Sequence, residues 1–183
     1  PRLISFFISM ERIAYRNVHA ITVLSEDLRT NVIAKLKGLD SPPTVRVISN
    51  FVDTEVVYPL DRNTKYRSEN GLDDRLVVMY AGNFGYSQPL DLLIGAAICH
   101  QHRDDIVYVA NGGGVRFREL IEAAKRVKNL VVVDYQPLER VSEVLASADI
   151  QVVLLRAGLA SASVPSKVYS ALASGRPVVA SVD

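Results

Sequence analysis

Lys167 and the hydroxyl side chains before it are the residues with the clearest chemical potential in this sequence. The loop "RAGLASASVPSK" is rich in Ala, Ser and Gly, and it supplies the hydroxyls of Ser161, Ser163 and Ser166. A lysine in the first turn of a helix is unfavourable against the positive end of the helix dipole. Its place at the start of the helix-like stretch "SKVYSALASG" therefore indicates an anionic partner nearby, with a solvated lysine as the alternative. The small residues of the loop would let a sugar or a diphosphate lie close against it.

A second candidate is the loop "AGNFGYSQPLDLL". Gly82 and Gly85 let the backbone turn tightly and approach a ligand closely. Ser87 or Gln88 stands just before Pro89, which suits the first position of a helix. We therefore expect free N–H groups at this helix start to hold a phosphate, and an ordinary strand–helix turn is the alternative.

Two further loops carry glycines or an aromatic side chain after an apolar run. The three glycines at 112–114 do not have the spacing G-x-G-x-x-G, so a flexible turn is favoured over a dinucleotide site. Tyr135 and Gln136 end another apolar run. A tyrosine there suits packing near a nucleobase whose edge the backbone reads, and an aromatic side chain that caps the sheet is the alternative.

These loops join apolar segments that alternate with amphipathic ones from residue 75 onward. The apolar segments are 76–82, 106–112, 130–135, 150–155 and 177–182. The alternation is typical of right-handed βαβ units and of a parallel sheet covered on both faces. We therefore predict a five-stranded, doubly wound, Rossmann-like α/β sheet over 75–183, in which ligands bind beyond the carboxyl ends of the strands.

The first 50 residues predict a separate αβαβ piece. The expected elements are a helix over 2–17, strands over 20–24 and 44–50, and a helix between the strands. Ser25 is the expected N-cap of the second helix, and Gly38 follows its last turn. The piece is too short to close its own sheet, so we expect it to be the tail of a preceding domain, joined by a polar, irregular linker over 51–74.

Composition and missing motifs argue against several classes of function. The 183 residues include 21 basic and 20 acidic side chains, so the net charge of +1 gives no electrostatic case for nucleic acid. His19, His100 and His102 have no plausible metal-binding partners. The sequence has no Ser-His-Asp order, G-x-S-x-G or P-loop for a hydrolase or kinase, and no fingerprint for an oxidoreductase. The single Cys99 fits a reducing compartment, and no apolar run is long enough to span a membrane.

Six segments, in order along the chain, resemble the retaining glycosyltransferases of the GT-B fold, family 4. They are "HAITVLSEDLRTNVIAKLKG", "VRVISNFVDTEVVYP", "VVMYAGNFGYSQPLDLLIGAA", "VYVANGGGVRFRELIEAAK", "LVVVDYQPLERVSEVLASADIQVVLL" and "VPSKVYSALASGRPVVAS". The resemblance implies two Rossmann-like domains that face a cleft, and a C-terminal domain that binds a nucleotide-sugar donor without a metal or other cofactor. It implies that residues 1–50 end the N-terminal acceptor domain, 51–74 cross between the domains, and 75–183 form most of the donor-binding domain.

The resemblance also places the parts of the donor, although it assigns no catalytic residue in this chain. The diphosphate would lie against 82–87 and Lys167, the base near Tyr135 and Gln136, and the sugar against 158–164. The implied donor-binding residues are Gly82, Asn83, Phe84, Gly85, Ser87, Gln88, Gly112, Tyr135, Gln136, Ser163, Ser166, Lys167 and Ser170.

Four positions depart from the common pattern of the family. Ser170 and Ala162 replace two glutamates, one of which holds the ribose hydroxyls, and Asn83 and Gln88 replace a basic pair that clamps the diphosphate. A subgroup that resembles transferases of N-acetylated deoxysugars in surface polysaccharide synthesis often carries Asn and Gln at the latter two positions. The missing glutamates leave a degenerate, non-catalytic nucleotide-binding or scaffold domain as the alternative function.

The same resemblance implies the partners and location of the whole protein. We expect a UDP-sugar as donor, a saccharide or lipid-linked acceptor, and a cytoplasmic location. The apolar, arginine-containing helix over 2–17 suits attachment to the inner face of a membrane, with a core helix as the favoured alternative. Because the first residues read as the inside of a longer protein, we expect this chain to be a fragment that is inactive alone and that self-associates through an exposed sheet edge.

Overall fold

The computed structural model describes residues 2–72, 74–159 and 163–182. By its internal contacts the chain divides into two compact units. The first unit contains residues 1–50 with 161–164, and the second contains residues 51–160 with 165–183.

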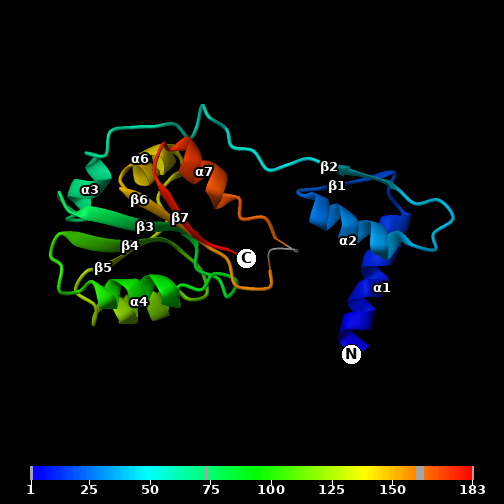
Figure 1. Ribbon diagram of the computed structural model, residues 1–183, viewed down its shortest axis with the longest axis horizontal. Coiled ribbons are helices and arrows are strands. Elements are labelled where there is room, and N and C mark those ends of the chain that lie inside the picture. The colour runs from blue at the N-terminus through cyan, green and yellow to red at the C-terminus, as the bar shows by residue number, and fades with distance from the viewer. Residues whose placement is uncertain (1, 73, 160–162, 183) are drawn as a thin grey trace. The chain divides into compact units, whose positions relative to one another are not determined.

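The first unit has the element order that the sequence predicts (Figure 1). Its elements are α1 (Arg2–Arg16), β1 (Ala20–Val23), α2 (Glu26–Leu36) and β2 (Thr44–Val47), and the two strands pair in parallel. The Ser25 hydroxyl accepts a hydrogen bond from the Leu28 N–H at 3.2 Å, and Gly38 has a φ of +84° after the last turn of α2. The predicted N-cap and C-terminal glycine are therefore confirmed, whereas the second strand is shorter than the predicted 44–50.

The second unit is built on a five-stranded parallel sheet with the order β5-β4-β3-β6-β7. The strands are β3 (Leu76–Asn83), β4 (Ile106–Gly113), β5 (Leu130–Val133), β6 (Ile150–Leu154) and β7 (Val178–Ser181). The helices are α4 (Asp91–Cys99), α5 (Phe117–Ala124), the 3-10 turn η1 (Leu138–Arg140), α6 (Val141–Ala146) and α7 (Lys167–Ala173). Each predicted strand is present, and the Rossmann-like sheet is confirmed.

Alternation along the central strands creates one apolar core on each face of the sheet. Tyr80 and Tyr108 pack in the same cluster as residues of α4 and α5. Met79 and Val109 pack in the opposite cluster, which includes Val144 of α6. Figure 1 shows α4 on one side of the sheet and α6 and α7 on the other. The sheet is therefore covered on both faces, as its long apolar runs require.

The segment 51–74 is not irregular throughout, and that prediction is wrong. It contains α3 (Lys65–Glu69), with Thr64 as the N-cap. Tyr66 and Leu72 are fully buried in the core of the second unit. The buried Arg67 pairs with Asp149 at 3.3 Å and donates to the Ser147 carbonyl. Tertiary burial of these few side chains fixes a helix that is too short and polar to show in the sequence pattern.

Candidate functional site

A cavity of about 300 Å³ lies within the second unit at the carboxyl ends of its central strands. The predicted donor-binding residues that line it are Gly82, Tyr135, Gln136, Lys167 and Ser170. Most of the remaining lining is apolar, from the sheet and from α6 and α7. The structure thus brings together residues from three of the four candidate loops, because parallel strands end at the same edge of the sheet.

Lys167 is the first residue of α7, as the sequence predicts, and its side chain lies along the backbone of Gly82. A Cβ atom on Gly82 would stand only 2.0 Å from the lysine Cε, so a side chain at this position would displace the end of the lysine from its present place. Nζ lies 5.7 Å from the centre of the Tyr80 ring. Burial lowers the pKa of Lys167, and among the described residues no carboxylate pairs with it. An anion at this position would compensate the partly buried charge.

Gly112 supports the same edge of the sheet through its backbone. It is the strand partner of Gly82, and both have a positive φ, of +146° and +138°. A Cβ atom on Gly112 would stand 1.9 Å from the Gly82 carbonyl oxygen. Gly112 does not line the cavity, so its contribution is to let the two strand ends approach each other.

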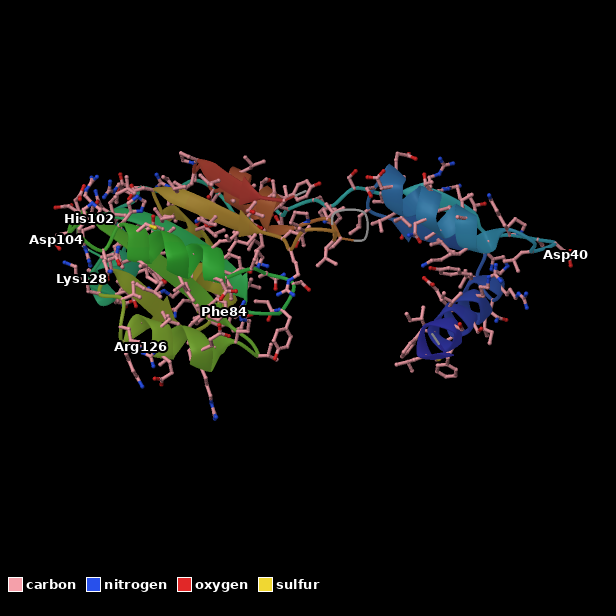
Figure 2. All side chains as sticks on the ribbon, turned by 60° about the horizontal axis from the view of Figure 1, so that its bottom comes forward. Asp40, Phe84, His102, Asp104, Arg126 and Lys128 are labelled. Carbon is pink, nitrogen blue, oxygen red and sulfur yellow. The ribbon has the colours of Figure 1, made fainter. Side chains whose placement is uncertain are left out.

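Phe84 is a core residue, and this corrects its expected place in the donor site. Its ring is fully buried and stacks on Phe117 with the centroids 6.0 Å apart. Its N–H donates to the Gly113 carbonyl, and its carbonyl accepts from the Arg116 N–H. Both backbone groups and the side chain are therefore used to hold the loop. Figure 2 shows Phe84 far from His102, Asp104 and Lys128, which lie at the opposite end of the sheet.

The helix after this loop begins later than the sequence predicts. Helix α4 starts at Asp91, and Leu90 precedes it without a side-chain cap, so Pro89 is not the first helical residue. Leu90 is fully buried, and its carbonyl accepts a hydrogen bond from the Ile94 N–H at the start of the helix. Asn83, Gly85, Ser87 and Gln88 do not line the cavity. Their proposed contacts with a diphosphate stay predictions.

Arg116, which the sequence did not single out, holds the end of the loop between β3 and α4 in place. Its guanidinium is mostly buried and pairs with Asp91 at 2.9 Å and with Glu119. It also donates to the backbone carbonyl of Gln88 at 3.3 Å. The hydrogen bonds that the guanidinium donates to the Glu119 carboxylate are the main cause that raises its pKa.

Tyr135 and Gln136 form the outer rim of the cavity. The Tyr135 ring is 56% exposed, and its hydroxyl donates to the Gly113 carbonyl at 3.3 Å. The Gln136 amide nitrogen donates to the Asp134 carbonyl at 3.1 Å, while its oxygen accepts from Arg140 at 3.2 Å. The ring therefore presents a largely free, positioned face, and this geometry suits stacking with a flat ligand.

The residues of the last loop are placed only in part. Ser170 lines the cavity, and Ser166 is exposed just before α7 without capping it. Ser163 groups with the first unit by its contacts, and Ser161 and Ala162 lie outside the described residues. The predicted contacts between a sugar and 158–164 stay predictions.

The sequence did not point to several of the residues that line the cavity. Asn111 and Gln151 are buried polar residues within otherwise apolar strands. A polar side chain inside the runs "IVYVANG" and "IQVVLL" was the signal that could have identified them. Pro137, Leu138 and Val141 add an apolar wall that sequence alone gives no reason to place here.

The described residues contain neither a cluster that could bind a metal ion nor a helix that could span a membrane. No three His, Cys, Asp or Glu side chains in the described ranges gather closely enough to hold a metal ion. Over these same residues, no helix combines the length and apolar character needed to cross a bilayer. His100 is engaged elsewhere, since its Nδ1 lies 2.6 Å from the Tyr108 hydroxyl.

The fold resembles known glycosyltransferase structures. HepE from Anabaena in complex with UDP and glucose superposes with a TM-score of 0.72 at 18% identity, over 94% of this chain and 47% of HepE. WaaG, a glycosyltransferase involved in lipopolysaccharide biosynthesis, superposes with a TM-score of 0.64 at 17% identity, over 87% of this chain and 43% of WaaG. The predicted GT-B type of fold is confirmed by these likenesses.

Curated proteins match at similar levels of identity. The putative colanic acid biosynthesis glycosyl transferase WcaI of Escherichia coli K12 is 24% identical over 91% of this chain and 41% of its own length. The phosphatidylinositol N-acetylglucosaminyltransferase GPI3 subunit of Saccharomyces cerevisiae YJM789 is 26% identical over 73% of this chain and 30% of its own length. This chain therefore spans less than half the length of these relatives.

The family model described as "Glycosyl transferases group 1" matches residues 75–182, which is more than half of the sequence. That range contains all five strands of the sheet and every residue that lines the cavity. The chain belongs to the group 1 glycosyl transferase family.

Proposed function

We propose that this chain is part of a retaining glycosyltransferase and that its second unit binds the UDP-sugar donor. The observation that supports this most directly is the position of Lys167. It is a partly buried cation, without a carboxylate partner among the described residues, at the edge of a largely apolar cavity. A nucleoside diphosphate combines an anionic group with a flat, weakly polar base, so it fits both features.

In this proposal each part of the site has one task. Lys167 holds the diphosphate and stabilises the negative charge that grows as the leaving group departs. The exposed face of Tyr135 stacks on the base, and the Ser170 hydroxyl reaches a ribose hydroxyl. These groups bind and orient the donor, and none of the described residues is assigned as a catalytic base or nucleophile. No metal ion is needed, since the lysine supplies the positive charge.

The names of similar proteins support the choice of donor and acceptor. HepE has been solved with UDP-glucose, and TarM from S. aureus with UDP. WcaI is named for colanic acid biosynthesis, and the GPI3 subunit for transfer of N-acetylglucosamine to phosphatidylinositol. We therefore propose a saccharide or lipid-linked acceptor and a role in polysaccharide or glycolipid synthesis.

We also propose how the chain divides between the two domains of such an enzyme. Residues 1–50 would end an acceptor domain, 51–74 would cross to the donor domain, and 75–183 would form the donor domain. Asn83 and Gln88 favour the subgroup that transfers N-acetylated deoxysugars. Because residues 1–50 would supply only part of an acceptor domain, we expect no sugar transfer by residues 1–183 alone. For the whole protein we propose a location in the cytoplasm or at the inner face of a membrane.

One observation favours a second function, which is a non-catalytic nucleotide-binding or scaffold domain. Ser170 lines the cavity where the family usually has a glutamate, so the ribose would meet a neutral partner. A neutral hydrogen bond contributes about 1 kcal/mol, against about 1.5–3 kcal/mol for a charge-assisted one. Compared with a glutamate, Ser170 therefore binds the ribose more weakly, while Lys167 remains available to bind the diphosphate.

Calorimetric titration of the purified protein with UDP, GDP and UDP-sugars separates these functions. Saturable heat with UDP and a UDP-sugar, and weaker heat with GDP, is the result expected of a UDP-sugar transferase. Binding of UDP without a preference for any UDP-sugar favours the scaffold. Absence of heat with every nucleotide would refute the proposed function.

A further inference from the structure

A buried pair of polar side chains joins α3 to the floor of the cavity. The Tyr66 hydroxyl donates a hydrogen bond to Asn111 Oδ1 at 2.8 Å. Tyr66 is fully buried, and Asn111 is 6% exposed and lines the cavity. Burying such a pair beside an apolar cluster is costly unless its hydrogen bonds are satisfied.

The pair fixes which end of the Asn111 amide faces outward. Burial raises the pKa of Tyr66, so its hydroxyl keeps its proton and remains a donor. That proton engages the oxygen of the amide, and the NH2 group then has to point elsewhere. Within the described residues no hydrogen bond is found for this NH2 group, and it is not fully shielded from solvent. Asn111 therefore presents an oriented donor to the cavity.

We propose that Asn111 reads the nucleobase of the donor, by donating from its amide nitrogen to the C4 carbonyl oxygen of uracil. Tyr66 is then a positioning residue that prevents the amide from flipping. This inference rests on the proposed function, and it adds the residues that choose the base. Cytosine carries an amino group in place of one uracil carbonyl, so it would place two donors against each other in this site.

The geometry predicts separate effects for two substitutions. Asn111→Leu removes the donor and should weaken UDP binding about fivefold, as expected for one neutral hydrogen bond, with little change for CDP. Tyr66→Phe keeps the amide but frees it to rotate. It should leave UDP affinity within about threefold of wild type and raise CDP affinity, so the preference for UDP falls.

Asn129 offers a matched control for the loss of a buried amide. It is 4% exposed, its side-chain amide has no hydrogen-bond partner within the described residues, and it precedes β5 at the other end of the sheet. Asn129→Leu should change neither the UDP affinity nor the ratio of UDP to CDP affinity. Thermal melting of all three variants checks that each remains folded.

Calorimetric titration with UDP and CDP then decides the proposal. A fall in the UDP to CDP ratio in both Asn111→Leu and Tyr66→Phe supports it. If the wild-type protein binds UDP and both variants keep its ratio, the pair is only structural and the inference is overturned while the proposed function stands. If the wild-type protein binds no UDP, the proposed function and this inference fail together.

Discussion

Replacing Lys167 with methionine tests the central feature of the site. Methionine keeps an unbranched side chain of similar length, so it can follow the same path along Gly82 while losing the charge. In the free protein the lysine charge is partly buried and unpaired within the described residues. The substitution should therefore weaken ligand binding and stabilise the unliganded fold, two effects that general damage to the structure would not combine.

The size of the binding effect follows from the bond that is lost. A hydrogen bond between an ammonium and a phosphate oxygen is charge-assisted and contributes about 1.5–3 kcal/mol. Lys167→Met should therefore weaken UDP binding by about 10- to 150-fold. Lys125→Met is the matched control, since Lys125 is exposed and forms an ion pair with Glu122 at 2.6 Å, one turn earlier on the helix. That variant should bind UDP as tightly as wild type.

The stability effect has a defined dependence on pH. Burial lowers the pKa of Lys167 from its ordinary value of 10.5, so the folded state binds the proton less well than the unfolded state. The cost of the charge is fully present below the folded-state pKa, and it disappears as the pH rises toward 10.5. Lys167→Met should thus melt at a higher temperature than wild type near neutral pH, and the difference should shrink at alkaline pH.

Calorimetry with UDP and melting curves between neutral and alkaline pH measure both effects. Unchanged UDP affinity in Lys167→Met would refute the assignment of this lysine to the diphosphate. An equal loss of affinity in Lys125→Met would show that the effect is a general one of net charge.

Three further predictions concern other parts of the chain. Gly112→Ala should lower the free energy of unfolding by about 1–3 kcal/mol, because its Cβ would meet the Gly82 carbonyl at 1.9 Å and its φ is +146°. Gly95→Ala, in open space on α4, should not destabilise the fold in the same chemical melts. Ser170→Glu should tighten UDP binding about fivefold by calorimetry, and no change would argue against a ribose contact there. α1 exposes seven large apolar side chains, including Phe7, so the protein should sediment with anionic vesicles and Phe7→Ser should sediment less.

Much of the fold could be predicted because it depends on local periodicity. The runs "LVVMYAG" and "IVYVANG" are apolar on both faces, which is the signature of strands buried in a parallel sheet. Alternation of strands and helices then fixes right-handed crossovers and brings the strand ends to one edge. That reasoning predicted Tyr135 and Lys167 at one edge of the sheet, and both line the cavity there. Ser170, which also lines it, was expected only from the resemblance to the family.

Residue roles within the loops were harder to predict. In the sequence Phe84 lies among residues that we expected to bind the donor, yet its ring packs in the core against Phe117. Pro89 suits a helix start, yet α4 begins at Asp91, after the buried Leu90. At Phe84 the packing of the side chain against a distant element outweighed the local signal.

The sequence by itself determined where the strands and helices follow one another along the chain and that the strands run parallel, since these follow from the spacing of apolar residues. It also determined that a lysine would begin the helix after the last loop. Only the tertiary structure decided that Tyr66, from a stretch that looks like a linker, would meet Asn111 on β4. The physical reason is that periodicity reports which face of an element is buried, whereas a hydrogen bond between residues far apart in sequence exists only once the packed elements have brought them together.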